Sequence, residues 1–402
     1  MFAQQGQDDD RAAARALTTT RSRGSARALR PIRALLAAVA VAAAALVALT
    51  AVTAGAAASA ATVQPTVLTG LTWHPLTLLN GWQSGESSFS TGDPAWAVKN
   101  GIVYLSGSLV QPGGGTAASS EFAVLPPAAR PAAHRGTLVA AYAYDGAQGF
   151  VDINADGTMD AWSNPGLPAQ QFTSLAGISY PAATTAAHSL SLVNGWKVDQ
   201  SGSILDPPGY VVTGGVVRLT GTITQPTGSN PEFAVLPAAA RPAHLDLIPV
   251  RMCASGDATL AVKPDGQMSV TGATARDCSF LAGVSFTAAS TAATSMSLIN
   301  GWQSAQGLKA TGDPAYSVTG GVVHLSGSLT QPGAGPSSSD EVAVLPSAVW
   351  PLHNVYVTTY AGNGAPGAVE IMSDGEMYAY GPNYADAQAF TSLAGISYPV
   401  GS

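Results

Sequence analysis

The sequence predicts an all-β protein made of three tandem antiparallel β-sandwich domains of jelly-roll type. Three observations favour this fold class: one set of motifs occurs three times, apolar and polar residues alternate within each copy, and each copy contains an Asp-Gly step between alternating segments. Alternation with period two is typical of strands with one buried face. No stretch after residue 60 shows a convincing helical period. Short strands at this spacing predict a sandwich or jelly roll.

The repeated motifs are most complete in the third copy. It begins at Asn300-Gly-Trp and closes with Ser-Leu-Ala-Gly-Ile-Ser-Tyr398, and the other copies begin at Asn80 and Asn194. Each copy has the size of an ordinary domain. We therefore divide the chain into repeat 1, repeat 2 and repeat 3, at residues 73–181, 188–286 and 295–402.

Several short strands are expected in each repeat. Residues 101–109 alternate, with Val103 and Leu105 on the buried face, and residues 121–125 form a second strand that ends at two prolines. Asp-Gly steps predict hairpin turns at Asp156, Asp265 and Asp374. With one strand at the Asn-Gly-Trp motif and one at the closing motif, we expect seven or eight strands per repeat.

The first 60 residues have the composition of an export signal. Residues 1–33 end in a basic segment, residues 34–58 are nearly all Ala, Leu and Val, and Ala58-Ser59-Ala60 resembles a cleavage site. If the segment is not cleaved, it is about long enough to anchor the chain in a membrane. Residues 61–72 follow as a linker. We expect an exported, extracellular protein.

Charge argues against nucleic acid as a partner. The chain has a formal net charge of −7 and only 10% charged residues. The first sixty residues hold seven arginines and three aspartates, so the rest has 10 basic and 21 acidic residues. Binding to nucleic acid depends on basic clusters that neutralise phosphates, and this part of the chain has none.

The two cysteines, Cys253 and Cys278, both lie in repeat 2. In an exported chain, two cysteines in one domain most simply form a disulfide, and two buried free thiols are the alternative. Alignment of the repeats places Cys278 where the others have Phe172 and Phe390. If the disulfide forms, a crosslink replaces an aromatic core residue in repeat 2.

The order of the motifs resembles the C-terminal receptor-binding head domain of bacteriophage tail fibres. The resemblance rests on Asn-Gly-Trp, Gly-x-Val-x-Leu-Ser-Gly, Val-Leu-Pro, Asp-Gly and Ser-Leu-x-Gly-Ile-Ser-Tyr, and it covers nearly all of each repeat. It implies a compact β-sandwich that binds receptors, often saccharides, and assembles as a homotrimer. An Arg-Pro step follows Val-Leu-Pro at Arg130 and Arg241, but repeat 3 has Trp350 there.

This chain departs from such heads in two ways, because it has an export signal and carries three copies in one chain. We therefore hypothesise that the repeats pack around a pseudo-threefold axis as a monomeric, single-chain trimer. Three independent domains on short linkers are the alternative, because a shared fold does not determine assembly.

Two sets of aromatic residues occupy equivalent positions in the repeats. Trp82, Trp196 and Trp302 follow Asn-Gly, and we expect them to have structural roles in the core, where large aromatic residues most often lie. The second set lies beside turns and forms a candidate saccharide platform, with core packing as the alternative. Its members are Trp96, Tyr210 and Tyr316.

Tyr104, Arg218 and His324 share one position on the polar face of the strand at residues 101–109 and its equivalents. They are ligand-binding candidates, because the core does not dictate their chemistry. A solvated face that tolerates change is the alternative interpretation.

No metal, cofactor or catalytic group is predicted. Asp152, Asn154 and Asp156 imitate the start of a calcium loop, but the required glutamate is replaced by Ser163, and a hairpin turn explains the pattern. No Gly-x-Ser-x-Gly motif or histidine pair at ligand spacing occurs. Carboxylate pairs of a glycan-acting hydrolase meet in space and leave no sequence pattern.

The sequence therefore predicts a secreted, non-catalytic protein that binds a cell-surface or environmental saccharide through sandwich loops. The alternatives are a structural or wall-associated surface protein without a small ligand, and a glycan-acting hydrolase.

Overall fold

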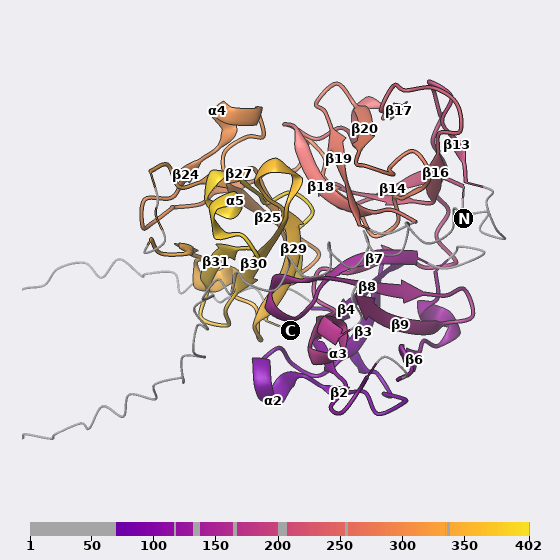
Figure 1. Ribbon diagram of the computed structural model, residues 1–402, viewed down its shortest axis with the longest axis vertical. Helices are drawn as coiled ribbons and strands as arrows, with labels where there is room; N and C mark the ends of the chain where they lie inside the picture. Colours follow the sequence, from indigo (N-terminus) through magenta and orange to yellow (C-terminus); the bar gives the residue numbers. More distant parts are fainter. Residues whose placement is uncertain are drawn as a thin grey trace, which may run out of the picture. The chain divides into compact units, whose positions relative to one another are not determined.

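The computed structural model describes residues 70–401, except 116–117, 132–136, 164–166, 200–206, 254–255, 334 and 336–337. All the described residues belong to one compact unit and consist mainly of antiparallel strands, so the all-β prediction is confirmed (Figure 1). The expected export signal and most of the linker lie outside the described residues. Among the residues described, no helix is long and apolar enough to cross a membrane.

Each repeat forms two four-stranded sheets and one three-stranded sheet, and every strand pair between described residues stays within one repeat. In repeat 1, the first sheet has the order β1 (His74–Pro75), β3 (Ala95–Lys99), β4 (Ile102–Ser106) and β11 (Ser179–Pro181). The three-stranded sheet has the order β10 (Thr173–Ser174), β5 (Ser108–Val110) and β2 (Gln83–Ser84). The second four-stranded sheet has the order β6 (Glu121–Val124), β9 (Thr158–Ser163), β8 (Gln148–Ile153) and β7 (Thr137–Tyr142).

Repeat 2 has the same three sheets. They are β12 (His188–Ser189), β14 (Gly209–Thr213), β15 (Val216–Thr220) and β22 (Ser285–Thr287); β13 (Lys197–Val198), β16 (Thr222–Thr224) and β21 (Ser279–Phe280); and β17 (Glu232–Val235), β20 (Gln267–Thr271), β19 (Asp257–Val262) and β18 (Asp246–Arg251).

Repeat 3 has its sheets in the same order. Its sheets are β23 (Thr294–Ser295), β25 (Ala315–Thr319), β26 (Val322–Ser326) and β33 (Ser397–Pro399); β24 (Gln303–Ser304), β27 (Ser328–Thr330) and β32 (Thr391–Ser392); and β28 (Glu341–Val344), β31 (Glu376–Tyr380), β30 (Pro366–Ile371) and β29 (Val355–Tyr360).

Short helices interrupt the strands, although the sequence shows no helical period. The α-helices are α2 (Glu86–Phe89), α3 (Leu167–Gln171), α4 (Gln306–Lys309) and α5 (Tyr384–Ala389). The 3₁₀ turns are η1 (Pro127–Ala129), η2 (Tyr144–Gly146), η3 (Ala238–Ala240), η4 (Ser347–Val349) and η5 (Gly362–Gly364). Each element contains at most six residues, which is too short to produce a period that spans two or more turns.

The core of each repeat lies between its sheets and uses residues from all three. Repeat 1 buries Leu105 of β4, Leu109 of β5 and Phe122 of β6 in one cluster. Equivalent residues form the clusters of repeats 2 and 3. Each such side chain contributes about 1.5–3 kcal/mol through burial, so the apolar residues of the alternating strands stabilise each repeat.

The hairpins at the three Asp-Gly steps are confirmed by the pairing of β8 with β9, β19 with β20 and β30 with β31. The strand expected at residues 101–109 is instead two strands. The chain breaks at Gly107, where φ is +86°, and passes from the sheet of β4 into the sheet of β5. A Cβ on Gly107 would stand 2.5 Å from Asp93 O, so only glycine fits this crossing.

The closing motif and the Asn-Gly-Trp motif also differ from the expectation of one strand each. Residues 173–181 form β10, a turn at Ala176-Gly177, and β11 in another sheet. Asn80-Gly81 is a turn before the two-residue strand β2. The described residues of each repeat thus contain eleven strands, because the sequence pattern does not reveal two-residue strands.

Candidate functional site

The tryptophans that follow Asn-Gly lie in the cores of the repeats. Trp82 is 4% exposed, and its indole Nε1 donates to Ser119 O at 3.1 Å. The side chain of Asn80 donates to Glu121 O at 2.9 Å, which ties the turn to the start of β6. The same two bonds recur in the other repeats, from Trp196 to Asn230, Asn194 to Glu232, Trp302 to Ser339 and Asn300 to Glu341. These residues therefore attach each turn to its sandwich.

The second aromatic set stands at the edge of each core. Trp96, Tyr210 and Tyr316 lie on β3, β14 and β25, and each is partly exposed while it packs against the core of its own repeat. The exposed His74 stacks on Trp96 with ring centroids 4.5 Å apart, and His188 stacks on Tyr210 at 5.2 Å. In repeat 3, Thr294 pairs with Tyr316. Each repeat thus presents one aromatic ring to solvent, and two of them add a histidine.

Tyr104, Arg218 and His324 meet where the repeats contact one another. Arg218 Nε donates to Ser179 Oγ at 3.2 Å and Arg218 Nη2 to Tyr104 OH at 3.1 Å. Arg218 is 2% exposed and His324 is 3% exposed, so neither lies on a solvated face, and that interpretation is wrong for them. Burial lowers the pKa of Arg218, and burial together with the Arg218 charge lowers the pKa of His324 to about 3. His324 is therefore neutral at pH 7.

The residue five positions after the leucine of Val-Leu-Pro makes the same hydrogen bond in all three repeats. Arg130 Nε donates to Leu125 O at 3.1 Å, and Arg241 Nε donates to Leu236 O at 2.9 Å. Trp350 Nε1 donates to the equivalent Leu345 O at 2.6 Å. The tryptophan therefore replaces the hydrogen bond of the arginine, although it carries no charge.

The closing motifs contact a neighbouring repeat in a closed cycle. Strands β7, β18 and β29 contact one another pairwise, one from each repeat. A Cβ on Gly177 of repeat 1 would stand 3.2 Å from Val357 of repeat 3. A Cβ on Gly395 of repeat 3 would stand 3.0 Å from Ile248 of repeat 2, and one on Gly283 of repeat 2 would stand 2.6 Å from Val139 of repeat 1. Repeat 1 thus contacts repeat 3, repeat 3 contacts repeat 2, and repeat 2 contacts repeat 1 through equivalent residues, which is the arrangement of a pseudo-threefold assembly.

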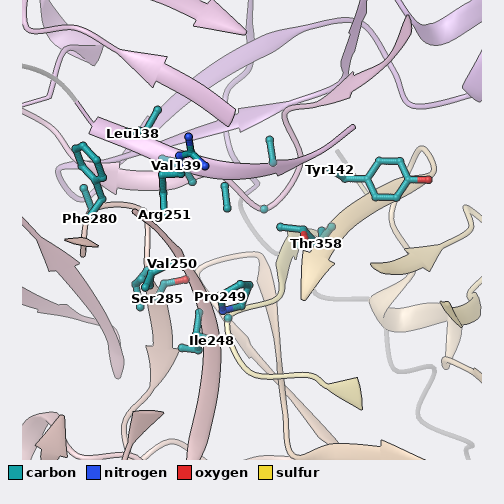
Figure 2. Close-up of a pocket in the computed structure, with 18 of the residues that line it drawn as sticks. Leu138, Val139, Tyr142, Ile248, Pro249, Val250, Arg251, Phe280, Ser285 and Thr358 are labelled. Carbon is teal, nitrogen blue, oxygen red and sulfur yellow. The ribbon is translucent and has the colours of Figure 1, made fainter. Parts of the chain in front are cut away.

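A pocket opens where these strands meet, and Figure 2 shows side chains from β7 and β18 with Thr358 of β29 around it. The contacts that flank it differ in chemistry. Arg251 lies over the Phe150 ring, with its guanidinium carbon 3.8 Å from the ring centroid, and 5.0 Å from the centroid of Trp162. At the equivalent position, Tyr142 accepts a hydrogen bond from Tyr380 OH at 3.2 Å. One interface thus uses a cation–π contact and another uses aromatic hydroxyls.

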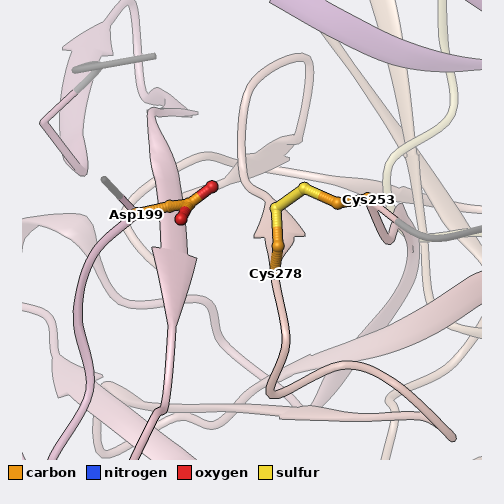
Figure 3. Close-up of side chains that lie close together, drawn as sticks. All are labelled: Asp199, Cys253 and Cys278. Carbon is orange, nitrogen blue, oxygen red and sulfur yellow. A yellow bond between two sulfur atoms is a disulfide. The ribbon is translucent and has the colours of Figure 1, made fainter. Parts of the chain in front are cut away.

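The two cysteines form a disulfide, as expected, with their Cα atoms 5.3 Å apart. Asp199 lies beside the sulfur atoms, as Figure 3 shows. Metal ions bind cysteine as the thiolate, and a disulfide offers none. The cluster is therefore a crosslink beside a carboxylate and not a metal centre. Cys278 is buried, like Phe172 and Phe390 at the equivalent positions.

One pair of carboxylates was not predicted from the sequence. Asp152 on β8 pairs with Asp160 on β9, so both side chains emerge on one face of the sheet. Burial, and secondarily the charge of Asp160, raises the pKa of Asp152 to about 6. The pair occurs in repeat 1, whereas repeat 2 has Ala261 opposite Ser269. The two positions are equally distant from Asp156 in the hairpin turn, and that symmetry is the signal that could have revealed them.

Comparisons with protein-family models, with curated proteins and with solved structures find no match for this chain. The resemblance to tail-fibre heads thus remains an interpretation of the repeated motifs.

Proposed function

We propose that the protein is an exported, non-catalytic binding protein that recognises a saccharide of a cell surface or of the environment. The observation that carries the proposal is the partly exposed aromatic ring that each repeat presents at one edge, at Trp96, Tyr210 and Tyr316. Aromatic faces pack against the C–H faces of sugar rings, and three rings in one chain allow binding at several points. The exposed His74 and His188 add hydrogen-bonding groups beside two of the rings.

A glycan array probed with the purified protein tests this function. We expect binding to a subset of glycans, and weaker binding after Trp96→Ala or Tyr210→Ala, because each change removes a ring. Tyr210→Phe is the matched control, because it keeps the ring and should preserve most of the binding. An array without any signal would instead favour a structural surface protein without a small ligand.

Export and assembly are parts of the same proposal. The segment at residues 1–60 directs export, and cleavage near Ala60 releases the protein, whereas an uncleaved segment anchors it. The mass of the protein recovered from the medium distinguishes these outcomes. Light scattering tests the assembly: a particle of one chain supports a monomeric pseudo-trimer, and a particle of three chains contradicts it.

A glycan-acting hydrolase is the second candidate function, and the Asp152–Asp160 pair is the observation that favours it. Glycoside hydrolysis uses two carboxyl groups, one of them with a raised pKa that lets it act as an acid. Release of reducing ends from bound glycans, lost in Asp152→Asn, would establish this activity. Binding without release in the wild type would leave the non-catalytic function.

A further inference from the structure

Three side chains with metal-ligating atoms meet in repeat 2. Asp199 follows β13, Cys253 follows β18 and Cys278 precedes β21, and Figure 3 shows the carboxylate beside the two sulfur atoms. A carboxylate oxygen and both sulfur atoms lie within 4.8 Å of one another. In the oxidised state the cluster is a crosslink that offers no thiolate. Reduction of the disulfide, however, places two thiols and one carboxylate around one point.

The other two repeats lack this combination. Asp199 N donates to Thr222 O, and the same backbone bond in the other repeats identifies the residues that are equivalent to Asp199. Repeat 1 has Gly85, Tyr144 and Phe172 at the three positions, and repeat 3 has Ala305, Gly362 and Phe390. A disulfide accounts for the two cysteines, but it requires no buried carboxylate beside it. A shared role as metal ligands accounts for all three residues.

Hydrogen bonds that do not involve sulfur hold the backbones of the three residues in place. Cys253 N donates to Cys278 O at 3.3 Å, and Asp199 N donates to Thr222 O at 3.1 Å. Reduction of the disulfide leaves these bonds intact. Repeats 1 and 3 form the same three sheets without a cysteine, so we expect repeat 2 to keep its fold after reduction.

Two thiolates and one carboxylate suit a zinc ion. Zinc binds sulfur at about 2.3 Å in tetrahedral geometry, so two sulfur ligands stand about 3.8 Å apart. The cysteine Cα atoms are 5.3 Å apart, and rotation about χ1 of the exposed Cys253 brings the reduced sulfurs to that separation. Thiolate ligands select zinc over magnesium and calcium, which prefer oxygen.

The cluster is accessible from solvent. Cys253 is exposed, and Asp199 lines an open groove of repeat 2 together with Leu192, Thr224 and Asp277. An ion therefore reaches the ligands without a movement of the sheets. The groove also leaves room for a water molecule as the fourth ligand, and three protein ligands with one water are a common zinc coordination.

We propose that this cluster of Asp199, Cys253 and Cys278, the thiol cluster, is a zinc site when its disulfide is reduced. A dithiol reductant gives two electrons and two protons to the disulfide and becomes a disulfide itself, which leaves two cysteine thiols. Zinc binding then forms two Zn–S bonds and one Zn–O bond and releases both thiol protons to solvent. Transfer of two electrons from the thiolates to an external disulfide restores the crosslink and frees the ion. The inference is independent of the saccharide function.

Cobalt(II) is the probe for this site, because it occupies zinc sites and absorbs in the near ultraviolet when thiolates bind it. The full chain is reduced with a dithiol, the dithiol is removed without oxygen, and Co²⁺ is titrated. We expect this absorption in the reduced protein and none in the oxidised protein, and Zn²⁺ should abolish it by displacement. Zinc should also raise the melting temperature of the reduced protein but not of the oxidised protein, because only the reduced state binds it.

Asp199→Asn and Asp277→Asn form a matched pair, because each removes one carboxylate from the same groove. Asp199→Asn should raise the Kd for Co²⁺ at least about tenfold, because it removes a ligand and even residues that only support ligands contribute that much. Asp277 does not belong to the thiol cluster, so Asp277→Asn should change the Kd by about twofold at most. Cys253→Ser should lower the absorption at saturation to about half or less, because one thiolate remains.

Two results overturn the proposal. The first is a reduced protein that shows no thiolate absorption with Co²⁺, whether it is folded or unfolded. The second is an Asp199→Asn variant with the Kd of the wild type, because the cysteines would then bind the ion without the carboxylate. Circular dichroism of the reduced protein and of each variant confirms that the compared proteins are folded.

Discussion

The closed cycle of contacts between repeats makes a quantitative prediction for Gly283→Ala. Gly283 has φ +83°, and its Cβ would stand 2.6 and 2.7 Å from the two γ-carbons of Val139 and 3.1 Å from its Cβ. Valine is stiff at χ1 and three of its atoms are involved, so a rotamer change does not relieve the overlap. The left-handed backbone costs alanine about 1–2 kcal/mol. Overpacking adds about 1–3 kcal/mol, so the free energy of unfolding should fall by about 2–5 kcal/mol.

Gly301→Ala is the matched control, because Gly301 has φ +79° and nothing lies within 4 Å of its added Cβ. It should lose only the backbone contribution of about 1–2 kcal/mol. Urea denaturation of both variants measures the difference. Gly395→Ala and Gly177→Ala, with nearest contacts of 3.0 and 3.2 Å, should cost less than Gly283→Ala, in that order.

Adding Val139→Ala to Gly283→Ala tests the contact directly. Removal of the valine γ-carbons makes room for the new methyl group, so the combined loss should be smaller than the sum of the single losses. Equal losses for Gly283→Ala and Gly301→Ala would refute the closed cycle, because the closing motif would then not press on the neighbouring repeat.

Three further predictions concern single residues. Burial raises the pKa of Asp246 to about 8, above its unfolded value of 3.8, so the folded state loses stability as the pH rises from about 4 to 8. At pH 8 the free energy of unfolding of Asp246→Asn should therefore exceed that of the wild type by an amount on the order of 5 kcal/mol. At pH 3 the two should unfold at the same urea concentration, and a persistent difference there would contradict the assignment. Reduction of the Cys253–Cys278 disulfide, which joins residues 25 apart, should cost about 3 kcal/mol in thermal or urea unfolding, and Cys253→Ser should remove this sensitivity to reductant. Trp350→Phe should lose about 1 kcal/mol with its hydrogen bond to Leu345 O, and Trp350→Arg should lose less if the arginine of the other repeats is equivalent.

The sequence could reveal features that depend on neighbouring residues, and it missed those that depend on distant ones. The Asp-Gly steps are local, so they located the three hairpins correctly, and alternation identified the buried face of the strand at residues 102–106. The strand breaks at Gly107 because Asp93 O, fourteen positions earlier, lies close to it, and the sequence around residue 107 does not predict this contact. The closing motif was expected to form one strand, but it contains the Ala176-Gly177 turn, which belongs to the contact between repeats.

In the candidate site, too, the sequence did not reveal contacts between residues that are distant in the chain. The polar face that carries Arg218 could be assigned from alternation, but its burial by Tyr104 and Ser179 of repeat 1 could not. The core tryptophans were placed correctly because each is buried by its own repeat. The buried Oε1 atoms of Gln111 and Gln170 accept no hydrogen bond from the described residues, and they belong to two loops 59 positions apart, so only the fold brings them together.

A single chain of three repeats permits a buried charge that a symmetric trimer of identical chains could not easily contain. Identical subunits would repeat Arg218 three times around one axis, and each guanidinium would be buried close to two others of the same sign. Like charges in a low-dielectric interior repel strongly, and each would also lose its hydration. Here the equivalent positions hold Tyr104, whose hydroxyl accepts from Arg218, and His324, whose lowered pKa keeps it neutral. Tandem repeats thus allow each contact to change independently of its equivalents in the other repeats.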